Sequence, residues 1–528
     1  MKWKQAWLIS LVFALLNYAS ANELSPTEFK RIDELTQKLN IPELQKVMDE
    51  GKLTSVQLTQ FYLQQIEKKN PEINAIIGIL PNALANAEML DRERAKGIYR
   101  SDMHGIPIVV KDNIETKKLA TTAGSLALKD NVTKRDATLI KKLKKAGAII
   151  LAKANLSEWA NFRSERSSSG WSAIGGQTRN PLDINRSACG SSSGSAAAVA
   201  ANLAVAAVGT ETDGSITCPS SATGSVGIKP TVGLVSRYRV IPISESQDTA
   251  GPIAKSVVDA AILLAAMQGQ DNADPATKAR KFDFDDTYQQ DTSEFKLGWS
   301  LNGLRIGLLE SRVNSHEGVA NVYEKAIAKL EHAGAVIVPN LKTESYDKFR
   351  QDSYDVLLYE FKDGLNHYFT TLPNSLNGTT LEKLIQFNQD NRSSEMPYFQ
   401  QEIFEKAQAK GPLTDRAYKI ALELIQKATR EEGLDKLITE KKLDILITPT
   451  LGPAWTIDQI NGDHYGGGYS SYSAISGYPH LTLPMGKVKH LPIGLSVIGL
   501  ALDDAKIIAI AKQMEILFNE DPQTSESN

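Results

Sequence analysis

Short runs of apolar residues, typical of buried strands, alternate along this chain with longer segments whose apolar positions recur every three or four residues, as in amphipathic helices. The short runs predict strands at 73–79, 106–110, 149–152, 304–308, 335–338 and 445–447. The amphipathic segments predict helices at 26–39, with Ser25 as its cap, and at 44–48, 55–69, 82–96, 138–147, 319–333 and 506–518. Such alternation predicts an α/β fold, in which helices cover both faces of a sheet.

Three segments depart from this alternation. Residues 345–436 are richer in charged and aromatic side chains, and we expect a mostly helical elaboration that lies over the core. Residues 462–477 are rich in Gly, Tyr and Ser, which predicts a loop. The polar tail 519–528 is expected to be disordered. No Pro/Ser/Gly linker divides the chain, so we expect one domain over residues 22–518.

The N-terminus has the pattern of a cleaved signal peptide. Lys2 and Lys4 form a positive start, residues 6–18 are apolar, and 19–21 read Ala-Ser-Ala, a typical cleavage signature. The apolar run is shorter than the about 20 residues that a membrane-spanning helix needs. The absence of a Cys after this run argues against a lipoprotein. We therefore expect cleavage after Ala21 and a periplasmic or secreted protein, with no stable membrane association after cleavage.

Composition excludes some functions for the mature chain. Removal of Lys2 and Lys4 takes the formal charge from −3 to −5, and no basic run suggests nucleic-acid binding. Cys189 and Cys218 are too few for a disulfide framework, and their spacing fits no metal site. They are either two small buried side chains or, in an exported protein, one disulfide.

The segment from Ser187 to Pro219 is the most unusual part of the chain. It holds the Ser/Gly turn Ser187-Ala-Cys-Gly-Ser-Ser-Ser-Gly-Ser195, a run of small residues at 196–208, and a second turn, Gly209-Thr-Glu-Thr-Asp-Gly-Ser215. A Ser/Gly run alone is typical of a flexible linker. The Ala-rich run, however, favours a short buried helix. We expect this helix to bring together two turns that each present a serine.

A serine nucleophile needs a neighbouring base, and the candidate base here is Lys111. No His lies between His104 and His316. A lysine serves as a base when burial keeps it neutral. Lys111 ends the apolar run Gly105-Ile-Pro-Ile-Val-Val-Lys111, so its side chain is expected to lose solvation, whereas most lysines are solvated surface charges.

These motifs together resemble the amidase signature family of Ser-cisSer-Lys hydrolases. The similarity extends loosely over residues 44–517 and implies a mixed β-sheet covered by helices on both faces. Within the family, the chain is most similar to bacterial peptide amidases. The matching segments, in the family's order, are Gly105–Asn113, Gly190–Gly194, Gly209–Ser215 and Gly227–Gly233, with Glu211–Cys218 carrying the closer match.

The resemblance implies a role for each serine and for the lysine. Ser215 is the nucleophile, Ser191 follows a cis peptide bond to Gly190, and Lys111 is the base. No cofactor or metal is implied. The expected substrate is a peptide or small-molecule amide, most closely a C-terminal peptide amide, with other acyl or aryl amides as the alternative. The expected oxyanion hole consists of the backbone N–H groups of Thr212, Asp213, Gly214 and Ser215.

Several further side chains are weaker candidates. Asp112 and Asn113 either orient the base or cap a turn. Trp171 and Trp455 either line an acyl pocket or belong to the core. Arg163 and Arg166 either meet a carboxylate or are surface charges.

Other functions match parts of the sequence. Gly190–Gly194 fits G-x-S-x-G, with Ser192 as an α/β-hydrolase nucleophile, but that motif follows a strand and polar turn residues precede it here. Ser293 and Lys296 match the S-x-x-K of penicillin-binding proteins, but no K-T-G follows. The export signal argues against a glutamyl-tRNA amidotransferase, whose substrate is cytoplasmic. The non-enzyme alternative is an exported binding protein on an amidase scaffold, against which stand the intact catalytic positions.

Overall fold

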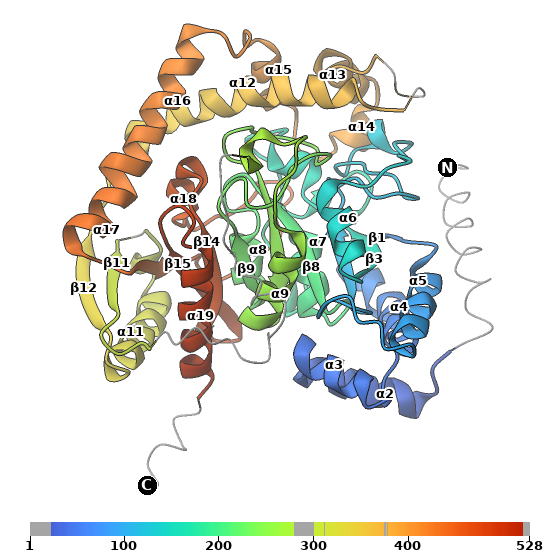
Figure 1. Cartoon of the computed structure of the whole chain (residues 1–528). Coiled ribbons are helices and arrows are strands. Elements are labelled where there is room, and N and C mark those ends of the chain that lie inside the picture. The colour runs from blue at the N-terminus through green and yellow to red at the C-terminus, as the bar shows by residue number, and fades with distance from the viewer. Residues whose placement is uncertain (1–22, 279–299, 311, 374–375, 377, 521–528) are drawn as a thin grey trace.

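A mixed sheet of 11 strands runs through the centre of the computed structural model, which describes residues 23–278, 300–310, 312–373, 376 and 378–520 (Figure 1). The strand order is β1-β3-β2-β8-β10-β9-β14-β15-β13-β11-β12. Four neighbouring pairs are parallel, namely β3/β2, β2/β8, β13/β11 and β11/β12, and the other pairs are antiparallel. The strands are β1 (Ile76–Ile79), β2 (Pro107–Lys111), β3 (Ile149–Ala154), β8 (Ala206–Glu211), β9 (Val226–Lys229), β10 (Thr249–Ala254), β11 (Arg305–Leu309), β12 (Val336–Leu341), β13 (Ile445–Pro449), β14 (His480–Val488) and β15 (Leu491–Ile498).

Helices cover both faces of this sheet, so the predicted α/β class is confirmed. Helices α7 and α8 pack on one face, and α6, α9, α11 and α19 pack on the other. Every residue of β2, β8 and β15 is buried, as expected for strands covered on both sides. The helices around the sheet are α2 (Pro26–Lys38), α3 (Ile41–Asp49), α4 (Ser55–Ile73), α5 (Ala83–Arg94), α6 (Thr138–Lys145), α7 (Ser193–Ala200), α8 (Thr217–Thr223), α9 (Val257–Met267), α11 (Glu317–His332) and α19 (Asp504–Asn519).

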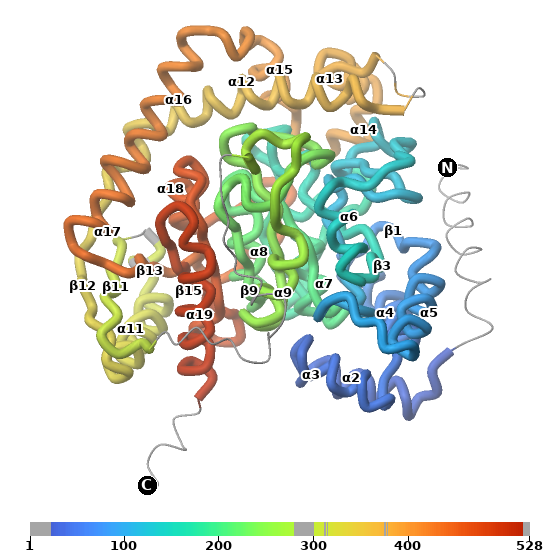
Figure 2. The backbone as a smooth tube through the Cα atoms, in the orientation of Figure 1, coloured from blue at the N-terminus to red at the C-terminus, as the bar shows by residue number. Residues whose placement is uncertain are grey.

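A layer of helices between β12 and β13 arches over one side of the core, as the backbone tube shows (Figure 2). Aromatic contacts attach this helical layer to the core. Trp159 packs edge-on against Phe404 and Phe369 of the layer, with ring centroids 5.7 and 6.5 Å away. The predicted, mostly helical segment at residues 345–436 is confirmed. The helices are α12 (Arg350–Phe369), α13 (Leu381–Asp390), α14 (Arg392–Glu395), α15 (Glu402–Gln408), α16 (Arg416–Thr429) and α17 (Asp435–Lys441).

One local prediction was confirmed and one was wrong. The short helix expected in the Ala-rich run 196–208 is α7, which ends at Ala200 because Asn202 adopts a left-handed conformation (φ 59°). From Ala206 the chain belongs to strand β8, which lies between β2 and β10. The expected loop at 462–477 contains helix α18 (Ser470–Ser476), which ends at Gly477 in the left-handed region.

The predicted signal peptide and most of the predicted disordered tail, 521–528, lie outside the described residues. No helix within the described part of the chain is long and apolar enough to cross a membrane.

Candidate active site

Strand pairing brings Lys111 to the second serine turn. Strands β2 and β8 are parallel neighbours, with Val110 opposite Val208. Their carboxyl ends therefore lie at the same edge of the sheet. Lys111 ends β2 there, and the turn at 212–215 begins where β8 ends.

Helix α7 brings the first serine turn to the same edge. The helix precedes β8 and packs against β8, β10, β2 and β3. Its residues are small because the packing is close: a Cβ on Gly194 would lie 2.4 Å from the carbonyl oxygen of Ala75. Ser191 stands just before α7, and its peptide bond to Gly190 is cis, as the family resemblance implied.

The Lys111 amine is buried in a polar network. Its Nζ donates hydrogen bonds to Ser191 Oγ (2.7 Å), Thr210 Oγ1 (2.8 Å) and the Thr210 carbonyl (3.1 Å). The Asn113 amide also donates to Thr210 Oγ1, at 2.9 Å. Burial lowers the pKa of Lys111 to about 7, although the nearby Asp248 and Glu211 act in the opposite direction. The amine is therefore neutral in much of the population near pH 7.

The side chain of Ser192 hydrogen-bonds to backbone groups of Thr210. Its Oγ donates to the Thr210 carbonyl (3.0 Å) and accepts from the Thr210 N–H (3.2 Å). Its own N–H donates to the Ser215 carbonyl at 3.1 Å, so it links the two serine turns. These contacts give Ser192 a structural role and argue against the nucleophile-elbow interpretation.

The turn at 212–215 presents four backbone N–H groups in succession. These four N–H groups donate no hydrogen bond to any of the described residues. The Ser215 hydroxyl likewise has no hydrogen-bond partner among the described residues. Lys111 and Ser191 are thus joined directly, whereas Ser215 stands nearby without a hydrogen bond to Ser191. Ser215 is 7% exposed, so its hydroxyl borders solvent.

Two carboxylates hold this turn from outside. The buried Glu211 accepts hydrogen bonds from the N–H groups of Ile216 (2.8 Å) and Thr217 (3.0 Å), at the start of α8. Asp213 accepts hydrogen bonds from the hydroxyls of Ser470 and Ser471, the latter at 2.6 Å. The turn is thereby tied to helix α18, more than 250 residues away in the chain.

Sequence reasoning missed Ser470, Ser471, Thr210 and Asp248. Asp248 accepts a hydrogen bond from the Thr212 hydroxyl at 2.6 Å. Thr210 lies within the recognised motif Gly209–Ser215, and this was the only sequence signal for any of the four residues. Nothing local marks the two serines of α18, because their partner is distant in sequence.

Of the weaker candidates, Arg163 and Trp171 are parts of the core. The buried Arg163 guanidinium pairs with Glu158, lies 3.6 Å from a Glu395 carboxylate oxygen, and stacks 4.3 Å from the ring centre of Phe399. Trp171 packs edge-on against the same Phe399, at 5.3 Å. Arg163 is thus not a surface charge, whereas Arg166 is exposed.

The remaining candidates lie close to the serine turns. Asp112, the residue that follows the base, is buried, and its carboxylate is anchored by the Lys153 amine 3.0 Å away. Trp455 belongs to an apolar cluster with Cys189 and Cys218, and its ring N–H donates to Asp463 at 3.1 Å. Ser293 and Lys296 lie outside the described residues.

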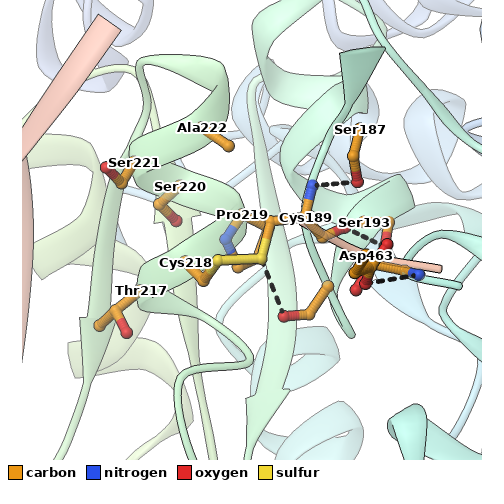
Figure 3. Close-up of a disulfide and its surroundings, with 12 residues drawn as sticks. Ser187, Cys189, Ser193, Thr217, Cys218, Pro219, Ser220, Ser221, Ala222 and Asp463 are labelled. Atoms are coloured by element: carbon orange, nitrogen blue, oxygen red, sulfur yellow. Dashed lines mark hydrogen bonds between the residues drawn. A yellow bond between two sulfur atoms is a disulfide. The ribbon is translucent and has the colours of Figure 1, made fainter. Parts of the chain in front are cut away.

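The two cysteines form a disulfide that connects the serine turns (Figure 3). The sequence had left this pairing open. Cys189 lies two residues before Ser191, and Cys218 lies in the first turn of α8, three residues after Ser215. The disulfide therefore joins the flanks of both serine turns covalently.

A cavity of about 320 Å³ adjoins the Lys111 network. Asn113, Thr210 and Thr212 contribute to its lining, together with residues 237–245, 248–249 and 273–275 and part of α12. Within the described residues, no group of three or more His, Cys, Asp or Glu side chains is arranged to hold a metal ion.

Comparison with known proteins gives consistent matches over nearly the whole chain. The Amidase family model matches residues 57–508. A protein of Arabidopsis thaliana named "Probable amidase" is 39% identical over 511 residues, which cover 95% of this chain and 93% of that protein. The crystal structure of the peptide amidase from Stenotrophomonas maltophilia is 45% identical, with a TM-score of 0.85 over 91% of this chain and 96% of that one. A peptide amidase in complex with the competitive inhibitor chymostatin is 46% identical, with a TM-score of 0.86 over 91% and 97%.

Proposed function

Because this chain belongs to the amidase family and is an amidase that hydrolyses amide bonds, we propose that its substrates are C-terminal peptide amides and that Ser215 is the nucleophile. Ser191 and Lys111 form the proton relay. The observation that carries the proposal is the 2.7 Å hydrogen bond between the buried Lys111 amine and Ser191 Oγ, beside the free N–H groups of the 212–215 turn. A neutral lysine is a base, and free N–H groups stabilise an oxyanion.

The reaction has two halves. Ser215 Oγ attacks the amide carbon while its proton passes to Ser191, whose own proton passes to Lys111. The tetrahedral oxyanion accepts hydrogen bonds from the N–H groups at 212–215. The C–N bond then breaks, and the relay returns a proton so that ammonia leaves. Water attacks the acyl-enzyme with the relay again as base, which releases the acid and restores Ser215.

The relay requires a Ser215–Ser191 hydrogen bond that the free enzyme lacks. Catalytic hydrogen bonds are often long or poorly aligned without substrate, and they tighten in the complex. Rotation of the Ser215 hydroxyl toward Ser191 on substrate binding would complete the path. This step is part of the proposal.

The variants Ser215→Ala and Ser192→Ala test the nucleophile. We expect Ser215→Ala to lose amide hydrolysis and labelling by a fluorophosphonate probe. Ser192→Ala, if folded, should keep most activity and labelling. Labelled, active Ser215→Ala would refute the assignment, and loss of labelling in well-folded Ser192→Ala would revive Ser192 as the nucleophile.

The substrate proposal rests on the similarity to peptide amidases. Mass spectrometry of an amidated peptide should show conversion of the C-terminal amide to a free acid, with all internal peptide bonds intact. Efficient internal cleavage would contradict the proposal. Hydrolysis of small acyl or aryl amides alone would favour the alternative substrate class.

We also propose export, with residues 1–21 as the cleaved signal. The disulfide supports this, since disulfides persist in oxidising compartments. N-terminal sequencing of periplasmic or secreted protein should begin at Asn22. A cytoplasmic product that keeps Met1 would contradict the proposal.

A further inference from the structure

We propose that the Cys189–Cys218 disulfide positions the two serine turns for catalysis, so that its reduction lowers turnover rather than substrate binding. This inference rests on the proposed roles of Ser191 and Ser215. The two sulfur atoms are bonded, the Cα atoms lie 6.0 Å apart, and the two residues are separated by 29 positions in sequence. Figure 3 shows the bond between the segment around Ser187–Ser193 and the start of α8.

In the first serine turn, the backbone of Cys189 is held by serine hydroxyls on both sides. Its N–H donates to Ser187 Oγ at 3.0 Å, and its carbonyl accepts a hydrogen bond from Ser193 Oγ at 2.6 Å. These contacts span the segment that contains Ser191. A displacement of Cys189 is therefore passed to the serine that receives the Lys111 hydrogen bond.

On the second turn, Cys218 contacts the oxyanion segment directly. Its N–H donates to the Gly214 carbonyl at 2.8 Å. Gly214 adopts a left-handed conformation (φ 76°), and it immediately precedes Ser215. The position of Cys218 thus sets the Gly214–Ser215 peptide, whose N–H group is one of those proposed to stabilise the oxyanion.

Without the disulfide, only non-covalent contacts would join these two turns, namely hydrogen bonds and the packing of α7 against α8. The direct contact between them is the Ser192 N–H to Ser215 carbonyl bond, and Ser192 also bonds Thr210. The sheet and helices keep their own contacts, so we expect the fold to persist. The two turns gain freedom relative to each other, which disturbs a geometry that catalysis needs to within a fraction of an ångström.

The disulfide is mostly buried but keeps a small exposure to solvent. Cys189 and Cys218 are 4% and 6% exposed, and they pack with Leu451, Ala454 and Trp455. A small dithiol reduces the bond in a balanced exchange: two electrons and two protons pass to the cysteine sulfurs, which become thiols, and the dithiol becomes a cyclic disulfide.

The test compares oxidised, reduced and reoxidised full-length mature protein with an amidated peptide as substrate. Titration with a thiol reagent verifies two free thiols after dithiothreitol treatment. We expect reduction to lower kcat at least tenfold, to change KM less than threefold, and to slow fluorophosphonate labelling in parallel. Reoxidation should restore all three values.

The double variant Cys189→Ala/Cys218→Ala is the matched control. It should have the low kcat of the reduced enzyme and no response to dithiothreitol, and a thermal melt checks that it is folded at the assay temperature. Full kcat in protein with two titrated thiols would overturn the proposal, as would a change in KM alone. If Ser215→Ala kept activity, the proposed function would fail instead, so the two failures are distinguishable.

Discussion

Replacement of Lys111 by methionine removes the amine and keeps a similar side-chain volume. Burial lowers the pKa of this lysine from 10.5 to about 7. At about 1.4 kcal/mol per pKa unit, the fold favours the neutral amine by about 5 kcal/mol relative to water. At pH 7 about half of the molecules then carry the base, and at pH 6 about a tenth do.

The rate of the wild-type enzyme should follow this neutral fraction. We expect kcat/KM to rise about tenfold per pH unit below pH 7 and to level off above about pH 8. The charged groups that face Lys111, Asp248 and Glu211, are buried carboxylates whose pKa values burial raises. Both raise the pKa of Lys111, so removal of either charge should shift the rising part of the pH–rate profile to lower pH.

The rising limb of the pH–rate profile is measured from initial rates of ammonia release between about pH 5 and about pH 9, at constant ionic strength. Lys111→Met should lose nearly all activity, and its residual rate should not show the limb near pH 7. Lys111→Arg keeps a cation but cannot accept a proton, so it should be inactive throughout. A rate that is flat down to about pH 5, or the same limb in Lys111→Met, would refute the reasoning.

Stability provides an independent check on the same pKa. Between about pH 7 and pH 10.5, the unfolded chain protonates Lys111 and the fold does not, so the contribution of this lysine to stability rises with pH. Below pH 7 its burial destabilises the fold. Lys111→Met removes that cost, offset by about 3 kcal/mol for the lost hydrogen bonds. Denaturant unfolding should show the variant gaining stability relative to wild type at pH 7, and losing that advantage by pH 10.

Three further predictions concern the surroundings of the site. Lys111→Ala/Ser191→Ala should be only slightly less active than Lys111→Ala, because the two residues act as one relay; additive losses in kcat would contradict this. Asp213→Ala should lower kcat and leave KM nearly unchanged, and Asp213→Asn should lower kcat by a smaller factor, because the amide oxygen still accepts a hydrogen bond from a serine of α18. Equal kcat values in both variants and the wild type would show that this contact does not position the 212–215 turn. Arg163→Met should lower the free energy of unfolding by about 3–5 kcal/mol in urea, because two buried glutamates lose their partner, whereas exposed Arg166→Met should have little effect.

Local sequence determined the elements near the site. The apolar run before Lys111 predicted a buried strand that ends in a lysine, and β2 ends there. The four motifs identified the family, which the comparisons confirm, and with it an amide-hydrolysing enzyme. Such features can be predicted because the spacing of apolar residues that distinguishes a strand from a helix repeats within a few positions.

The run at 196–208 shows where local reasoning stops. Alanine-rich sequence favours helix, but pairing with β2 and β10 makes Ala206–Glu211 a strand. Intrinsic propensity is a weak preference, amounting to less than about 1 kcal/mol per residue, and tertiary pairing overrides it. The same reason explains why helix α18 appeared as a loop.

The contacts that hold the site were decided only by the tertiary structure. Asp213 meets Ser470 across 257 positions, and the Cys189–Cys218 disulfide was one of two open alternatives until the serine turns were seen side by side. Each of these contacts depends on where distant elements pack, and no periodicity within a segment carries that information. The sequence by itself therefore determined which residues carry the candidate chemistry, whereas the packing of the sheet, α8 and α18 decided how those residues are held.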